Sequence, residues 1–311
     1  MSAAPAYLGV VLIWSTTPMA VKLSTDTLSF SAAAGLRMLL ASLCCLLWLG
    51  IVRQRLRFDR EALASYAAAN IGVFGAMSCI YAAVTWVPSG LLSVIFGLAP
   101  VLSGVFARWL LGERTLSTVR VLALAIALGG LGVVFRGTLG FAPEAWPGLL
   151  LALVAVTLFA LSSVLVKRYS GNMSAAQHTA GSLLFSLPLF AAAWALSDGQ
   201  LPLEFSALSL GFVLYLAVIG STLGFMLYFS ILHRLTVAQV TLIPLATPVL
   251  ALLLGAVVLD EPVRADTVIG AALILGGLAL YQLNRGFKLP RRRRAAAAAT
   301  VENASAAKGR A

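Results

Sequence analysis

The chain has 311 residues, of which 60% are hydrophobic and only 11% are charged. A soluble globular protein carries about 25% charged residues, so this chain has too few charges to cover a water-facing surface, and most of its surface is expected to face lipid. Its 22 basic residues outnumber its 11 acidic ones. They gather in short gaps between apolar runs and in the C-terminal segment, which argues against a nucleic-acid partner.

Ten apolar runs follow one another along the chain, each about 18 to 24 residues long and able to cross about 30 Å of hydrocarbon. They cover residues 5–23, 29–51, 62–84, 88–111, 117–135, 146–167, 175–196, 207–231, 237–259 and 267–284. Lipid admits only helices and closed barrels, and these runs lack the two-residue alternation of barrel strands. The predicted fold class is an all-α membrane protein with ten transmembrane helices. The first run lacks the features of a cleaved signal peptide and is expected to be retained.

The basic residues between the runs predict the orientation. Ten spans place both termini on one side, and the basic segment after the last span predicts that this side is the cytoplasm. With that choice, all but four of the 22 basic residues lie on the inner side. Lys22, Arg136 and Arg264 fall in outer gaps, whereas Arg37 lies within an apolar run.

One segment occurs twice. FGLAPVLSGVFARWLLGER in the first half resembles PLATPVLALLLGAVVLDEP in the second, so that Pro100 aligns with Pro248 and Glu113 with Glu261. Each copy is followed by an apolar run with a Gly-Gly pair. Internal duplication in a polytopic membrane protein is typical of secondary transporters. Because each half has an odd number of spans, the two halves are expected to be inverted about an axis in the membrane plane.

Three segments follow from this pattern. Residues 1–140 form the first five-helix repeat and residues 141–286 the second, inverted one. Residues 287–311, with four consecutive arginines and an alanine run, are expected to form a disordered cytoplasmic tail. Such a tail fixes topology and contacts anionic lipid.

Several short motifs resemble those of the EamA-type drug/metabolite transporter superfamily. They are Trp14-Ser15 with Pro18 in the first run, Arg37 in the second, and LGER and LDEP after the fourth and ninth. The resemblance covers about residues 5–284. It implies a ten-helix exporter of the bacterial cytoplasmic membrane, similar to the amino-acid exporter YddG group. Helices 1–4 and 6–9 would then enclose a central cavity, with helices 5 and 10 outside it. The second copy departs from the first by having Asp260 where the first has Gly112.

Arg37 lies about two turns into its run. An Arg at the centre of a membrane helix costs about 2.5–3.5 kcal/mol on insertion and marks a candidate functional site. Arg37 is therefore predicted to face the cavity and to meet a substrate carboxylate or a helix C-terminus. The alternative is that its side chain extends to the outer interface.

The prolines are predicted hinges. Pro100 and Pro248 each remove a backbone hydrogen bond and bend a helix, and their symmetric placement favours a hinge role; Pro18 and Pro244 are further candidates. Prolines are also common in membrane helices without such a role. The aligned glutamates Glu113 and Glu261 are expected mainly to close helix ends.

Nine side chains within the runs are predicted to line the cavity: Trp14, Thr17, Arg37, Asn70, Tyr81, Ser93, Ser163, Tyr228 and Gln239. Amides are costly to leave unpaired in lipid, and aromatic rings offer an apolar wall for a substrate side chain. The alternative is that hydroxyls join helices and aromatic residues lie at the membrane interface.

The predicted function is a secondary transporter that exports small metabolites by alternating access, most of all amino acids, aromatic or of broad range. Drugs, nucleosides or sugar-type metabolites are the alternative substrates. A channel or an intramembrane enzyme is less favoured, because no filter-like segment and no catalytic set at membrane depth is visible. No metal site and no cofactor are predicted, since the cysteines and histidines lack ligand spacing. The expected partners are the substrate and lipid, and the expected oligomeric state is a monomer.

Overall fold

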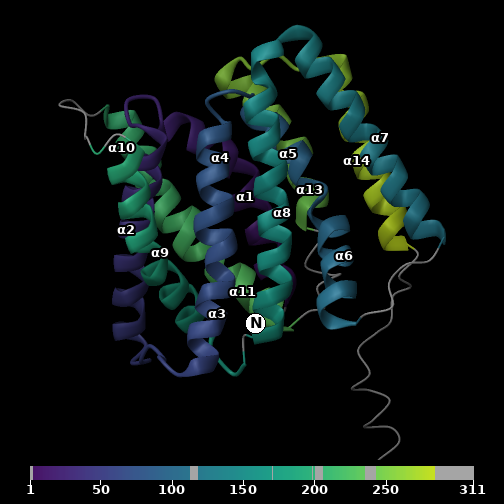
Figure 1. The fold of residues 1–311 in the computed structure, drawn as a ribbon. Helices are drawn as coiled ribbons and strands as arrows, with labels where there is room; N and C mark the ends of the chain where they lie inside the picture. The colour runs from purple at the N-terminus through teal and green to yellow at the C-terminus, as the bar shows by residue number, and fades with distance from the viewer. Residues whose placement is uncertain are drawn as a thin grey trace, which may run out of the picture.

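A computed structural model describes residues 3–112, 118–169, 171–197, 199, 206–234 and 243–283. Within these ranges every regular element is a helix, and none is a strand. Figure 1 shows the long helices packed side by side and running mostly along one direction. The predicted all-α membrane fold is confirmed: in lipid each backbone polar group needs a partner within its own helix.

The first half opens with two long helices, α1 (Ala3–Ser24) and α2 (Phe30–Ile51). Ser29 caps α2 by accepting a hydrogen bond from the Ala32 N–H at 3.2 Å. Asp59 caps the next helix through the Ala62 N–H at 3.1 Å. Both caps satisfy N–H groups that a helix start leaves unpaired. The remaining elements of this half are α3 (Arg60–Asn70), η1 (Ile71–Ala76), α4 (Met77–Ala83), α5 (Ser89–Phe96), α6 (Ala99–Leu111) and α7 (Thr118–Phe141).

The second half repeats this order. Its elements are η2 (Pro143–Ala145), α8 (Trp146–Tyr169), α9 (Ala175–Ser197), α10 (Ala207–Tyr215), η3 (Leu216–Leu223), α11 (Gly224–Arg234), α13 (Ile243–Leu259) and α14 (Ala265–Leu283). The third long helix of each half contains a π-helical stretch, η1 or η3, and these two stretches begin 145 residues apart. Such π turns are rare and are frequently found at functional sites. Neither stretch was predicted from the sequence.

The predicted spans agree with the helices to within a few residues in most cases. Seven helices of the described ranges are long and apolar enough to cross a membrane, and three shorter apolar helices cover 125–138, 247–259 and 265–277. These three overlap the predicted fifth, ninth and tenth spans. The total of ten spans and the inverted relation of the halves stay predictions.

The surface of the bundle is apolar, as the composition predicts. Leu47, Trp109 and Val257 are exposed by 69%, 82% and 79%. The interior holds small and branched side chains, among them the fully buried Ala41 and Leu149. Large side chains that are exposed in this way are the expected pattern for helices that face hydrocarbon.

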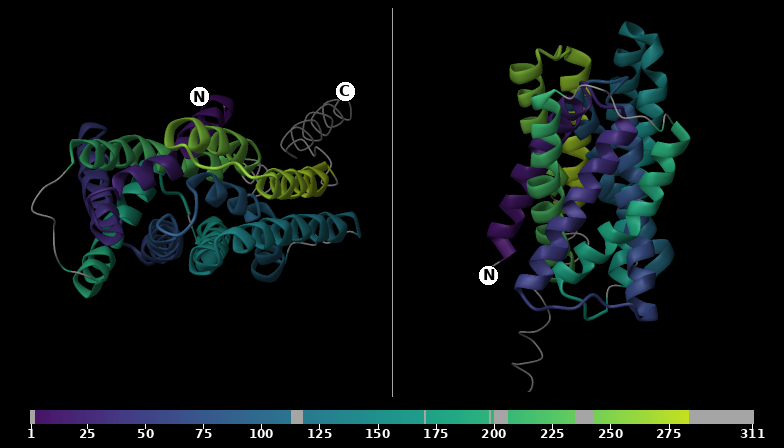
Figure 2. Two further views of the ribbon diagram at one scale, coloured as in Figure 1. Left: turned by 90° about the horizontal axis from the view of Figure 1, so that it is seen from above. Right: turned by 90° about the vertical axis from the view of Figure 1, so that its left-hand side faces the viewer.

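Helices α7 and α14 form a pair at one side of the bundle (Figures 1 and 2). The Gly-Gly motifs explain how closely the two pack. A side chain at Gly130 would lie 2.8 Å from the Gly270 carbonyl oxygen, and one at Gly277 would lie 2.6 Å from that of Ala123. Small residues let membrane helices approach at backbone distance. The other glycine of each motif, Gly129 or Gly276, has no atom within 4 Å of that position.

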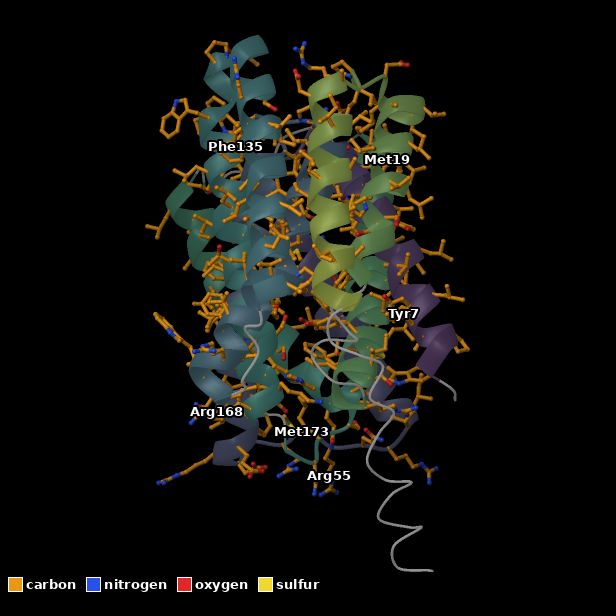
Figure 3. The ribbon with its side chains drawn as sticks, turned by 90° about the vertical axis from the view of Figure 1, so that its right-hand side faces the viewer. Tyr7, Met19, Arg55, Phe135, Arg168 and Met173 are labelled. Carbon is orange, nitrogen blue, oxygen red and sulfur yellow. The ribbon has the colours of Figure 1, made fainter. Side chains whose placement is uncertain are left out.

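Basic side chains gather at one end of the bundle. Arg55 and Arg168 lie there with Met173, whereas Phe135 lies toward the opposite end (Figure 3). Arg55 follows α2, which crosses the bundle from the end where α1 finishes. The end with Arg55 corresponds to the predicted cytoplasmic side.

Candidate functional site

A cavity of about 80 Å³ lies between the two halves, enough for several water molecules or a small solute. Its lining comes from α1, α2, α4 and α5 of the first half and from α8, η3, α11 and α13 of the second. The lining residues are Trp14, Thr17, Pro18, Arg37, Met77, Ile80, Leu92, Ser93, Phe96, Phe159, Gly220, Phe225 and Thr247. This set contains no carboxylate and one cation. Neither α7 nor α14 contributes to it, and α9 packs behind α2.

Arg37 provides the positive charge of the cavity, although only 1% of the residue is exposed. Its Nε donates a hydrogen bond to the Ser221 Oγ at 2.8 Å, and its Nη1 donates to the Tyr81 Oη at 3.4 Å. The guanidinium carbon lies 5.8 Å from the centre of the Tyr81 ring. The guanidinium is therefore fixed between α4 and η3, which come from opposite halves.

No carboxylate of the described residues forms an ion pair with Arg37. A buried charge is costly unless it is paired. Nη2 makes no hydrogen bond to another described residue, and a side chain at Gly220 would lie 3.4 Å from it. Because Gly220 has no side chain, there is room beside Nη2 for a group that accepts its hydrogen bonds. The geometry suits a planar anion such as a carboxylate.

Sequence reasoning missed Ser221, which positions this guanidinium. Ser221 is fully buried and lies on η3, where the π-helical turn changes the direction of the side chains that follow it. Its partner Arg37 is 184 residues away in the chain. The sequence offered one signal, the single Arg within an apolar run. A buried Arg requires a polar partner, but the sequence does not indicate which of the many hydroxyl groups is that partner.

An aromatic wall closes another side of the cavity. The ring centres of Trp14 and Phe159 are 5.6 Å apart, and those of Phe96 and Phe159 are 5.9 Å apart. Tyr228 packs against Trp14 at 5.1 Å, and its hydroxyl is 2.7 Å from the Ser163 Oγ. Tyr228 and Ser163, both predicted lining residues, support this wall from behind and are not part of the cavity lining.

The other predicted lining residues are divided between the cavity and the helix packing. Trp14, Thr17, Arg37 and Ser93 line the cavity, and Tyr81 contacts it through Arg37. The Thr17 hydroxyl also donates to the backbone carbonyl of its own helix at 2.8 Å. Such a bond uses the hydrogen of the hydroxyl and leaves the oxygen as an acceptor.

Asn70 lies away from the cavity, where it joins two helices. Its Nδ2 donates to the carbonyl oxygens of Tyr66 at 2.9 Å and of Ser182 at 3.1 Å, and thereby links α3 to α9. The predicted lining role therefore does not match this position: the Nδ2 group is paired with backbone oxygens, which leave no trace in a sequence, whereas Oδ1 has no hydrogen-bond partner among the described residues. Gln239 lies outside the described residues.

The predicted hinges lie inside helices or in their first turn. Pro18 is inside α1 and lines the cavity. Pro100 is in the first turn of α6, directly after the chain leaves α5 at Phe96. Pro248 is inside α13, and Pro244 is the second residue of that helix. Each proline removes a backbone N–H donor. Their role as hinges stays a prediction.

The model of the EamA-like transporter family matches residues 1–136 and 146–282 of this chain. The chain belongs to the EamA-like transporter family. It is thus a multi-pass membrane protein of a transporter family, as the recognised motifs indicate.

Relatives match most of this EamA-family chain. The "Uncharacterized transporter YoaV" of Bacillus subtilis is 23% identical over 273 residues, covering 87% of this chain and 93% of that protein. The "Probable terminal-alkyne amino-acid exporter" of Streptantibioticus cattleyicolor is 28% identical over 294 residues, covering 92% and 94%. A solved crystal structure has a TM-score of 0.67 with 24% identity over 91% of this chain and 98% of that one. That likeness concerns the fold.

Proposed function

We propose that this protein is a secondary transporter that exports small amino acids with apolar or aromatic side chains across the cytoplasmic membrane by alternating access. The observation that carries the proposal is Arg37. Its guanidinium is buried in a cavity between the halves, is positioned by Ser221 and Tyr81, and pairs with no carboxylate of the described residues. A substrate carboxylate supplies the missing anion.

The rest of the lining agrees with a zwitterion. The hydroxyls of Thr17, Ser93 and Thr247 are neutral groups that can accept hydrogen bonds from an ammonium group. Trp14 and Phe159 give an apolar surface for a side chain. A solute with several negative charges would bring more anions than the single cation of the lining can pair.

One relative has a name that agrees with this substrate class, since it is called an amino-acid exporter and aligns over nearly the whole chain. Drugs, nucleosides and sugar-type metabolites remain the alternative. Members of these classes without a carboxylate have no group that would pair with Arg37, so their transport would leave the buried charge unexplained.

Reconstitution tests the proposal. Purified protein in liposomes is assayed for initial uptake of a panel of radiolabelled amino acids, with and without a pH gradient. We expect saturable uptake of at least one apolar or aromatic amino acid and a strong loss of that uptake in Arg37→Gln. Uptake no higher than in protein-free liposomes for every amino acid would contradict the substrate class. Saturable uptake that Arg37→Gln leaves unchanged would contradict the role of Arg37.

A further inference from the structure

Glu261 is a buried carboxylate at the end of the bundle opposite Arg55. Only 8% of the residue is exposed. Its Oε1 forms an ion pair with the Lys22 Nζ at 2.8 Å and accepts the Ser89 N–H at 2.8 Å. Its Oε2 accepts the Ser89 hydroxyl at 3.0 Å and the Gly90 N–H at 3.2 Å. Four donors therefore converge on one carboxylate.

These donors belong to different helices. Lys22 is in the last turn of α1, and Ser89 and Gly90 begin α5. The first N–H groups of a helix have no partner within it, and its positive end favours an anion. Glu261, which follows α13 in the second half, supplies that anion to a helix of the first half. It thus ties together the ends of α1, α5 and α13, and all three helices line the cavity.

The backbone around Glu261 is shaped to hold it in this place. Asp260 has a φ of +49°, in the left-handed region that ends the helix and turns the chain back. The Glu261 N–H then donates to the Gly255 carbonyl at 3.1 Å. Gly255 has no room for a side chain, because its position lies directly against the Glu261 Oε2. A methyl group there would displace the carboxylate from Ser89.

We propose that Glu261, Lys22 and the first turn of α5 form a latch that holds this end of the cavity closed, and that its release opens the cavity to this side. The inference rests on the alternating-access part of the proposed function. If α5 separates from α13, the carboxylate loses its three donors on α5, and water that enters the open mouth replaces them. Because closed and open forms both satisfy the carboxylate, the latch can alternate between two states of similar energy.

Labelling of a cavity cysteine tests the latch without any substrate. Cys44, Cys45 and Cys79 are first replaced by Ala, and Ser93→Cys provides the reporter. A membrane-impermeant maleimide is applied to intact cells and, separately, to inside-out vesicles. In Glu261→Gln and Gly255→Ala, labelling from the Glu261 end should be about tenfold faster than in the parent, the ratio expected for loss of one charge-assisted hydrogen bond. Labelling from the Arg55 end should fall in the same variants.

Asp266→Asn is the matched control, since Asp266 lies at the same end and pairs with Arg264 at 3.4 Å. It should label at the parent rate. Gly255→Ala keeps both charges, so it guards against a folding defect specific to Glu261→Gln. Parent rates in both test variants, or equal acceleration in Asp266→Asn, would overturn the latch.

The two proposals can fail separately. If the wild-type protein transports amino acids but the latch variants label at the rate of the Ser93→Cys parent, the latch is wrong and the transport function stands. If the wild-type protein transports no amino acid but the latch variants label faster from the Glu261 end only, the substrate class is wrong and the latch stands.

Discussion

Replacement of Arg37 by Gln removes the one positive charge of the cavity lining while keeping a polar side chain. A hydrogen bond to a charged group contributes about 1.5–3 kcal/mol, and about 1.4 kcal/mol corresponds to a tenfold change in affinity. A carboxylate that meets Nη1 and Nη2 makes two such bonds, whose contributions are not fully additive. We therefore expect the KM for an amino-acid substrate to rise about 100-fold, within the range that these bonds allow.

Arg37→Lys is the graded variant. It keeps the charge but loses the planar fork and the bond to Ser221, so an intermediate rise of about tenfold is expected. Initial uptake into proteoliposomes is measured for the best amino acid and for its amide, which lacks the carboxylate. The amide should not lose affinity in Arg37→Gln, and this comparison within one preparation also shows that the variant is folded. Equal losses for the acid and the amide would refute the assignment of Arg37 to the carboxylate.

Three further outcomes are expected. Burial raises the pKa of Glu261, but the hydrogen bonds from Lys22 and the Ser89 N–H outweigh it, and the pKa lies below its usual range. The latch is then fully present above the ordinary Glu value of about 4.3 and is lost only as the pH falls through the lowered pKa. The thiolate is the reactive form of the reporter, so labelling rates are compared at the same pH. The ratio of the Glu261→Gln rate to the parent rate should stay constant from about pH 8 to pH 5, and a fall of this ratio near pH 6 would contradict this. The charged groups near the carboxylate are Lys22, which pairs with it, and Arg264, which lines the same surface pocket. Gly130→Leu should destabilise the protein by about 1–3 kcal/mol in thermal unfolding, because the larger side chain forces α7 away from α14. The control Gly129→Leu should leave the unfolding midpoint unchanged. Equal shifts of the midpoint in the two variants would refute the close packing of these helices. Ala at both Pro100 and Pro248 restores two backbone N–H groups and should lower the turnover with little change in KM, and unchanged turnover would count against the hinges.

The positions of the helices were predictable because lipid imposes a simple requirement. Each span must be long, apolar and internally hydrogen-bonded. The predicted run 29–51 therefore agrees with α2, and the run 175–196 agrees with α9. Arg37 was predictable for the related reason that one charge in an apolar run needs a special environment. The Gly-Gly motifs were visible in the sequence, although their contact with the backbone of the partner helix was not.

The partners of the polar groups were not predictable. Ser221 is one of many hydroxyls, and its contact with Arg37 depends on a π-helical turn that tertiary packing sets. The Asn70 Nδ2 is paired with backbone oxygens, which every residue carries. Glu261 was expected to close a helix end, yet the helix it caps is α5 of the other half. In each case the deciding contact joins elements that are far apart in the chain.

Counterflow tests whether a solute with a carboxylate crosses the membrane by binding to a saturable site that contains Arg37. Proteoliposomes are preloaded with an unlabelled amino acid identified in the panel, diluted, and given a trace of the labelled form outside. We expect a transient accumulation of label above equilibrium in the wild-type protein and no such accumulation in Arg37→Gln. Entry of label that is linear in concentration and shows no such overshoot would contradict it.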